Sequence, residues 1–441
     1  MAVDVLQLIA GTRAGAISAS VEAAIRGRGL GPGALLPPVR RLADRLGVSP
    51  TTVAAAYRDL HLRGLVTASG RRGTRVSPRP PVSHAQPPAP PAGVRDLAAG
   101  NPDPDLLPDL GPALARLRPD RRLYGEPPNR ADLLRLAGEL FAADGIPADF
   151  LLVVGGTLDG IERTLMAHLR PGDRVAVEDP GYPPVFDLLL ALGLSPQPLR
   201  LDDRGILPDD LEAALRGPVA ALVLTPRAQN PTGAALDAAR AAELREVLAE
   251  RPDVLVIEDD HAGPVAGAAA HTLCRDAPER WAVIRSFSKS LGPDLRVAAM
   301  AGDPVTISRV EGRQQLGTGW VSHVLQGLVP LLWHDRDVQA LMARAADAYA
   351  GRRRALVEAL AAHGIAAHGR SGMNVWVPVA DEAAALDALL DAGWAAAPGE
   401  RFRLRSGPAV RLSIGRMAPA DTPAVAAALG APLRPARTRT G

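Results

Sequence analysis

The sequence of 441 residues is too long for a single compact core, so two or three domains are expected, and its 47% of hydrophobic residues is enough to fill them. The formal net charge is +2, and no stretch of roughly 20 uncharged apolar residues exists, which excludes a membrane-spanning helix. The N-terminus lacks the pattern of a secretory signal, and Cys274 is the only cysteine, so we expect a cytoplasmic protein without an internal disulfide.

Positive charge is concentrated at the start of the chain. Residues 1–80 hold twelve arginines against four acidic residues. Such an excess on a small domain favours a polyanion as partner. On charge alone, a solvated basic surface is an equally good interpretation.

Helical periodicity dominates the first 60 residues. Residues 3–28 are expected to form one amphipathic helix. In residues 38–47 the side chains Val39, Leu42, Ala43 and Leu46 recur at i, i+3, i+4 and i+7, which predicts a second helix with one buried face. Gly47 is placed to end that helix.

A third helix is predicted to begin at Ser49, which acts as N-cap, with Pro50 in the first turn. The residues expected to be buried are Val53, Ala56, Tyr57 and Leu60, and those expected to face outward are Thr51, Thr52, Ala55, Arg58 and Asp59. The segment LVTASGRRGTRV then predicts two short strands around a basic tip. Residues 1–76 therefore predict a winged helix-turn-helix domain that binds DNA.

The next part of the chain divides into a linker and an α/β domain. Residues 77–95 contain seven prolines and no apolar periodicity, which indicates a semi-extended linker. From residue 96, short apolar runs alternate with helical stretches, so a mostly parallel sheet is expected. Within residues 96–441, a smaller α+β subdomain is expected over about 320–430.

Lysine occurs once in the whole chain. Of 50 basic residues 49 are arginine, and the exception is Lys289 in the segment RSFSKSLGPDLR. Arginine stays protonated, whereas lysine can lose its proton and condense with an aldehyde. Lys289 is therefore a candidate imine former. A surface lysine left by chance is the plainer alternative.

Several polar residues follow the predicted strands, where open α/β sheets bind ligands. Gly156, Thr157 and Leu158 open a helix whose free N–H groups can hold a phosphate, although many such turns need glycine only for the bend. Tyr182 can stack on a flat ring or simply pack on the surface. Asn230 lies in a tight turn between strand and helix.

Asp259 ends a predicted strand in the segment VIEDDHAG. A buried carboxylate there needs a cationic partner, and a protonated pyridine nitrogen is one. Capping of the next turn is the alternative. Ser286 and Arg296 flank Lys289 and can close a phosphate site.

The motifs in order resemble a known family. Tyr-Gly, Gly-Gly-Thr, Asp-Pro-Gly-Tyr, Asn-Pro-Thr-Gly, Glu-Asp-Asp, Ser-Phe-Ser-Lys and Val-Arg-Leu-Ser follow one another as in fold-type I, class I/II aminotransferases. The segment LPPVRRLADRLGVSPTTVAAAYRDL is similar to GntR-type DNA-binding domains. Together they resemble the MocR subfamily of transcription regulators.

The resemblance implies a role for each matching position. Lys289 forms the internal aldimine with pyridoxal 5'-phosphate (PLP), Asp259 pairs with the pyridinium nitrogen, and Tyr182 stacks on the ring. Asn230 bonds the phenolic oxygen, and Arg411 grips the carboxylate of a ligand. The phosphate is held by Gly156, Thr157, Leu158, Ser286 and Arg296, helped by Tyr124 from a second subunit. A two-fold homodimer is therefore expected.

The sequence departs from the family at several positions. His261 stands where a tyrosine usually bonds the phenolic oxygen, and a neutral imidazole is expected to donate to it with a different geometry. Ala228 replaces a histidine, and Asn129 replaces a glycine after the Tyr-Gly motif. These changes bear on transamination more than on cofactor binding.

In the DNA-binding part, Arg40 matches a DNA-contacting position, and Ser49, Thr51 and Thr52 start the recognition helix. Pro50 and Ala54 stand where relatives often carry basic residues. More of the affinity is therefore expected from phosphate contacts, which the chain can make through Arg40, Arg41, Arg58, Arg71, Arg72 and Arg75.

Two functions are compatible with these motifs. The first is a PLP-dependent regulator in which an amino-group ligand forms an external aldimine and repositions the DNA-binding domains on double-stranded DNA. The second is a working aminotransferase with an appended helix-turn-helix domain. A cofactor-free DNA-binding scaffold fits less well because Lys289, Asp259 and Asn230 occur together. No metal site is predicted.

Overall fold

The computed structural model describes residues 5–27, 29–62, 64–68, 73–77, 90–119, 121–275 and 278–430. The chain forms an N-terminal unit and a larger unit that follows it. Each of the two units is a separate structure with its own hydrophobic core.

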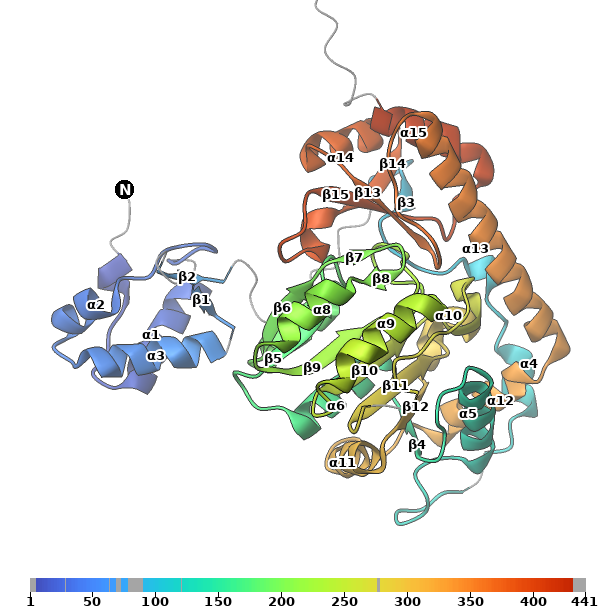
Figure 1. The fold of residues 1–441 in the computed structure, drawn as a ribbon, viewed down its shortest axis with the longest axis horizontal. Coiled ribbons are helices and arrows are strands. Elements are labelled where there is room, and N and C mark those ends of the chain that lie inside the picture. The colour runs from blue at the N-terminus through green and yellow to red at the C-terminus, as the bar shows by residue number, and fades with distance from the viewer. Residues whose placement is uncertain are drawn as a thin grey trace, which may run out of the picture. The chain divides into compact units, whose positions relative to one another are not determined.

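The N-terminal unit is a winged helix-turn-helix. Its elements are the 3₁₀ turn η1 Val5–Leu8, the helices α1 Ala14–Arg26, α2 Val39–Leu46 and α3 Pro50–Leu62, and the antiparallel strands β1 Val66–Ala68 and β2 Thr74–Val76 (Figure 1). The single helix expected over residues 3–28 is wrong. The helix is interrupted at Gly11, whose φ of 122° does not occur inside an α-helix.

The predicted buried face of α3 is confirmed. Val53, Ala56 and Leu60 are fully buried, and the buried Tyr57 donates a hydrogen bond of 2.8 Å to the carbonyl oxygen of Pro37. Ser49 caps the helix, because its Oγ accepts from the backbone N–H of Thr52 at 3.2 Å. The face opposite the core is therefore left for a partner.

Seven strands form the central sheet of the larger unit, in the order β4-β12-β11-β10-β9-β5-β6. They are β4 Leu151–Val154, β5 Arg174–Glu178, β6 Ser195–Leu199, β9 Val219–Leu224, β10 Leu255–Asp260, β11 Trp281–Ser286 and β12 Ala298–Gly302. β9, β10 and β11 run parallel, and β12 runs antiparallel to both of its neighbours. The predicted α/β sheet is confirmed, with β12 as an antiparallel strand that the sequence did not indicate.

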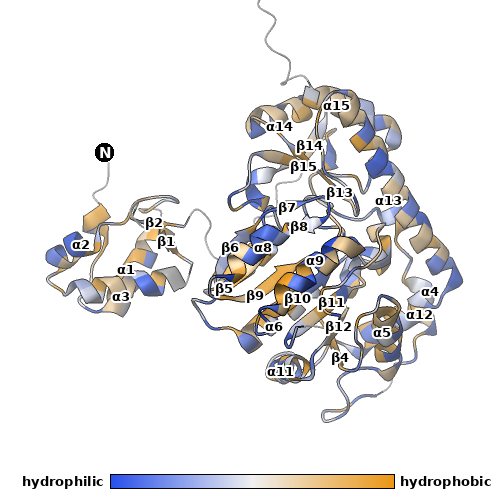
Figure 2. Cartoon of the chain, viewed as in Figure 1, coloured by the Kyte–Doolittle hydropathy of each residue, from blue (hydrophilic) through white to orange (hydrophobic). Residues whose placement is uncertain are grey.

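Helices enclose this sheet. They are α4 Gly111–Arg116, α5 Ala131–Ala143, α6 Thr157–His168, α7 Pro183–Ala191, α8 Pro208–Leu215, α9 Ala238–Ala249, α10 Ser288–Leu291, α11 Pro304–Gln315 and α12 His323–Trp333, and a small hairpin pairs β7 Leu201–Asp202 with β8 Gly205–Ile206. Most of the strands are largely hydrophobic, whereas α8, α9 and α11 show hydrophilic residues on their outer side (Figure 2). The core thus lies between the sheet and the inner faces of its helices.

A second core belongs to the C-terminal part. Its sheet has the order β13-β15-β14-β3, with β13 Asn374–Pro378, β14 Trp394–Pro398 and β15 Ala409–Ser413, and it packs with α13 Arg336–Ala362, α14 Glu382–Asp391 and α15 Thr422–Gly430. The fourth strand, β3 Arg95–Leu97, comes from the other end of the unit and runs parallel to β14. α12 packs into the core of the seven-stranded sheet, so the small subdomain begins along α13.

Two features are absent from the part of the chain that the structure describes, namely membrane-spanning helices and clusters of metal-ligating side chains. None of the helices there combines the length and apolar character that crossing a bilayer requires. Nor does any group of three or more His, Cys, Asp or Glu side chains there have the arrangement of a metal site.

Candidate functional site

A cavity of about 270 Å³ opens where the parallel strands end at their carboxyl sides. Ten residues singled out from the sequence line it, namely Thr157, Leu158, Tyr182, Asn230, Asp259, His261, Ser286, Lys289, Arg296 and Arg411. The structure thus brings together residues that lie up to 254 positions apart (411 − 157). Both subdomains contribute, because Arg411 lies on β15 of the small sheet.

Lys289 lies in the short helix α10 directly after β11. Its Nζ donates a hydrogen bond of 3.0 Å to the carbonyl oxygen of Gly100. Burial, the main cause, and the charge of Arg411 together lower the pKa of this amine to about 8, while Asp259 opposes the shift. A useful fraction of the amine is therefore unprotonated and nucleophilic near neutral pH.

Asp259, near the end of β10, and His261, the residue directly after that strand, both line the cavity. Asp259 is 3% exposed, and its Oδ1 is buried without a hydrogen-bond partner in the described part of the chain. Burial raises the pKa of its carboxyl to about 7, and neighbouring Asp260 adds to that shift. An orphaned carboxylate oxygen in a cavity needs a cationic donor, and the protonated ring nitrogen of PLP is such a donor.

The adjacent acid has the opposite environment. Asp260 binds the guanidinium of Arg227 at 2.8 Å and that of Arg285 at 2.6 Å, and Arg285 also binds Asp144 at 2.6 Å. The two arginines hold the pKa of Asp260 well below its usual range despite its burial. The two adjacent acids thus differ. Asp260 is neutralised by two arginines, whereas Asp259 is the unpaired group, because its Oδ1 has no partner in the described residues.

The N-terminus of α6 lies at one end of the cavity. Gly156 is the N-cap with φ 110°, and a Cβ at this position would lie 2.7 Å from Nη2 of Arg296. Arg296 itself adopts a left-handed conformation (φ 48°) and donates to the carbonyl oxygen of Gly155 at 3.2 Å. Free N–H groups and a guanidinium at one end suit an anion.

Ser288 is a residue that sequence reasoning missed at this end. Its Oγ is buried and has no partner in the described residues, while its backbone N–H donates to Oγ of Ser286 at 3.1 Å. The signal was available, since Ser288 is the second hydroxyl of the Ser-Phe-Ser-Lys motif. Other lining residues had no such signal in the sequence, among them Ala99, Gly100 and Met373.

Arg411 also has a donor group without a partner among the described residues. Its Nη1 donates to Oδ1 of Asn230 at 3.1 Å, and its Nη2 donates to the carbonyl oxygen of Ala98. Its Nε is buried and has no partner in the described part of the chain. Burial lowers the pKa of the guanidinium to about 10, so it stays charged at neutral pH. A ligand carboxylate would satisfy this charge.

Tyr124 does not line the cavity. Its ring is 92% exposed and meets only the edge of Trp320, with ring centroids 5.6 Å apart. The structure therefore does not bring Tyr124 to the site within one chain. Its expected place in the site of a second subunit stays a prediction.

The residues expected to bind DNA lie in the N-terminal unit. Arg40, Arg41 and Arg58 are exposed, and Arg75 donates to the carbonyl oxygen of Gly33 at 3.0 Å. Oγ of Ser49 is hydrogen-bonded to the hydroxyls of Thr51 and Thr52, at 2.7 and 2.9 Å. Arg71 and Arg72 lie outside the described residues.

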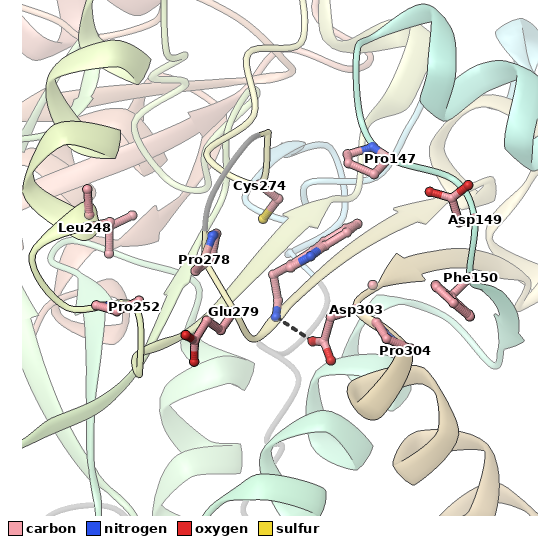
Figure 3. A pocket seen from close by; sticks show the side chains of 13 residues that line it. Pro147, Asp149, Phe150, Leu248, Pro252, Cys274, Pro278, Glu279, Asp303 and Pro304 are labelled. Atoms are coloured by element: carbon pink, nitrogen blue, oxygen red, sulfur yellow. Dashed lines mark hydrogen bonds between the residues drawn. The ribbon is translucent and has the colours of Figure 1, made fainter.

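A larger cavity of about 600 Å³ lies at the opposite ends of the strands, around Trp281 and Gly302 (Figure 3). Phe150, Cys274 and several prolines line it, and Asp303 accepts a hydrogen bond of 2.9 Å from the backbone N–H of Trp281. None of the residues singled out for chemistry is part of it. The smaller cavity is therefore the candidate site, in spite of its volume.

Comparison with known proteins agrees with this architecture. Residues 92–429 match the family "Aminotransferase class I and II", and residues 13–76 match "Bacterial regulatory proteins, gntR family". The chain is 42% identical over 371 residues to the vitamin B6 salvage pathway transcriptional repressor PtsJ of Salmonella typhimurium, covering 83% of this chain and 86% of that protein. The chain belongs to the MocR-type regulators.

Two more distant similarities concern this MocR-type regulator. The HTH-type transcriptional regulator TauR of Rhodobacter capsulatus is 29% identical, with 78% of each chain covered. The kynurenine aminotransferase of Pyrococcus horikoshii is similar in structure, with a TM-score of 0.70, 23% identity, and coverage of 78% of this chain and 93% of that one. At that identity the likeness shows the fold alone, which is the predicted fold-type I transferase fold.

We expect the two adjacent aspartates of the MocR-type regulator to respond oppositely to conversion into asparagine. Asp260→Asn leaves two buried guanidinium groups without their partner and should lower the free energy of unfolding by about 3–5 kcal/mol. Asp259→Asn should raise it at alkaline pH. The folded pKa of Asp259, about 7, lies above the ordinary 3.8, so its carboxylate costs stability as pH rises through that window.

Urea unfolding of the cofactor-free protein at about pH 4 and about pH 8 measures both effects, and the gain from Asp259→Asn should vanish at the lower pH. Equal destabilisation by the two substitutions at both pH values would show that Asp259 is not the unpaired group.

Proposed function

We propose that this regulator holds PLP in the cavity of about 270 Å³ through Lys289 and that occupancy of the cavity controls DNA binding. One observation carries the proposal. An amine with a lowered pKa and a buried carboxylate oxygen without a partner line the same cavity. Few ligands other than a pyridinium aldehyde satisfy both groups at once.

Bound PLP supplies an aldehyde that condenses with primary amines. The chain's own residues supply the rest. Lys289 provides the amine, Asp259 holds the ring nitrogen protonated, and Tyr182 provides a flat surface beside the ring. The N-terminus of α6, Arg296 and the two serines of the Ser-Phe-Ser-Lys motif would hold the phosphate.

The free Nε of Arg411 supports an effector that carries both an amino group and a carboxylate. The amino group would replace Lys289 as the partner of the aldehyde, and Arg411 would bind the carboxylate. An amino acid or a closely similar compound is the chemical class that meets both requirements.

The names of two relatives favour a second candidate, in which a vitamin B6 compound is itself the signal. PtsJ is named a repressor of the vitamin B6 salvage pathway, and PdxR of Corynebacterium glutamicum, 30% identical over 60% of each chain, is named a pyridoxine biosynthesis regulator. In that case binding of PLP alone would change the affinity for DNA. No comparable observation favours a working aminotransferase.

A homodimer in the cytoplasm completes the proposal. Tyr124, Leu123 and Leu316 are exposed by 92%, 72% and 90%, which is unusual for large apolar side chains in a monomer. A two-fold partner covering them would bring Tyr124 near the partner's phosphate end and would place two winged helices on one DNA duplex.

Replacement of Lys289 tests cofactor capture. Lys289→Ala should abolish the visible absorbance that PLP acquires on binding the wild-type protein. Lys289→Arg is the matched control, since it keeps the positive charge but cannot form an imine. Both variants should lack the band, and a band of wild-type intensity in either one would refute the role of Lys289.

Arg411→Gln tests the effector class. Loss of a charged hydrogen-bonded pair should weaken the spectral response to amino acids about 10- to 100-fold and leave the response to a carboxylate-free amine unchanged. Binding of an operator selected from random duplexes should then change on addition of amino acid. If PLP alone changes the affinity for the operator and a further amine has no additional effect, the second candidate would be favoured.

The salt dependence of DNA binding tests the N-terminal unit. Arg40→Ala should reduce the slope of log affinity against log salt by about one, because one phosphate contact is lost. Arg216→Ala, which removes an exposed arginine paired with Glu212 in the aminotransferase domain, is the control and should leave the slope unchanged. Equal slopes for wild type and Arg40→Ala would exclude Arg40 from the interface.

A further inference from the structure

His261 is hydrogen-bonded to the backbone rather than to another side chain. Its Nε2 lies 3.0 Å from the carbonyl oxygen of Ala228. A carbonyl oxygen can only accept, so Nε2 must carry the ring proton. In a neutral imidazole the other nitrogen, Nδ1, then has a bare lone pair.

The carbonyl group that holds His261 is fixed. Ala228 is buried in a left-handed conformation (φ 56°), and its N–H donates to Oγ of Ser371 at 2.8 Å. Ser371 in turn donates to the carbonyl oxygen of Gly233 at 2.9 Å and is itself fully buried. The N–H of Gln229, in the same peptide group as the Ala228 carbonyl, donates to the carbonyl oxygen of Ala234 at 3.1 Å, so this group is held with its oxygen toward the imidazole.

The surroundings keep His261 neutral. Burial is the main cause that lowers its pKa to about 4, and the positive charge of Lys289 adds to it. Asp260 acts in the opposite direction, but the ion pairs with Arg227 and Arg285 already neutralise it. The other charged or titratable groups that line the cavity with His261 are Tyr182, Asp259, Arg296 and Arg411.

The neighbouring hydrogen-bond donor in the cavity is the side-chain amide of Asn230. Oδ1 of Asn230 accepts from Arg411, so the amide nitrogen of Asn230 is left to donate toward the cavity. On the proposed function, Asp259 takes the ring nitrogen and Lys289 the aldehyde carbon. The phenolic oxygen beside that aldehyde then lies at the end of the ring toward Asn230 and His261.

We propose that His261 is a hydrogen-bond acceptor in this cavity, so that the phenolic group of bound PLP meets one donor, Asn230, and one acceptor, the Nδ1 of His261. This inference rests on the proposed function. An acceptor stabilises the protonated form of the bound chromophore, whereas a donor stabilises the anionic form. His261 is thus a positioning residue that makes the chromophore retain its proton to higher pH than two donors would allow.

As an acceptor, His261 does not donate to the phenolic oxygen, in contrast to the expectation from the sequence. Its only ring proton is committed to Ala228. The backbone carbonyl at position 228 thus dictates which nitrogen of His261 is free.

A spectral pH titration of the PLP-bound protein tests the inference. His261→Tyr exchanges the acceptor for a donor and should lower the midpoint of the visible transition by about one pH unit, the equivalent of one hydrogen bond. His261→Phe removes the acceptor without adding a donor and should lower it by less. An unchanged or raised midpoint in His261→Tyr would overturn the proposal.

The tautomer can also be read without cofactor. Histidine ¹⁵N shifts of the PLP-free wild-type protein, with the His261 signal assigned by its loss in His261→Phe, should show the Nε2-protonated neutral ring near neutral pH. A proton on Nδ1, or on both nitrogens, would overturn the proposal. If wild type never acquires visible absorbance with PLP, the proposed function fails, whereas the tautomer measurement still decides the state of His261.

Discussion

The ion pairs of Asp260 with Arg227 and Arg285 hold the candidate site together. They join the end of β10 to two neighbouring segments, one that carries Asn230 three residues after Arg227 and one that leads through Ser286 to Lys289. Because the guanidinium groups of Arg227 and Arg285 neutralise Asp260, neither of them pairs with Asp259, whose Oδ1 has no hydrogen-bond partner in the described part of the chain. The alternation of a single strand thus separates a neutralised charge from a carboxyl group that lines the cavity.

A second constraint is that two segments far apart in the sequence, β3 and β14, pair in the small subdomain. β3 pairs with β14, and the residues after it bring Gly100 to Lys289 and Ala98 to Arg411. The cavity therefore has walls from both subdomains, which is a suitable arrangement for a site whose occupancy must be sensed. A ligand that binds Arg411 and Lys289 together would link them, and any difference in its affinity between two domain arrangements would shift the population.

Much of the site could be predicted because its chemistry demands particular residue types. An amine is needed to capture an aldehyde, so Lys289 could be recognised among 49 arginines. A buried acid is needed to stabilise a pyridinium nitrogen, so Asp259 could be selected as well. The winged helix could be predicted equally well, because the buried face of α3 follows from the spacing of its apolar residues. Gly100 and Met373 could not be found in this way, because the backbone or an apolar side chain carries no chemical signature in sequence.

The sequence by itself determined the two-domain organisation, the helix-turn-helix, the α/β class and the set of reactive side chains, because periodicity and residue chemistry are local properties. Only the tertiary structure decided which of the adjacent acids is neutralised, that residues 95–97 join a sheet otherwise built from residues 374–413, and which nitrogen of His261 is free. Each of these depends on a partner far away in the chain. Hydrogen bonds and ion pairs of that kind are set by packing, which no local pattern encodes.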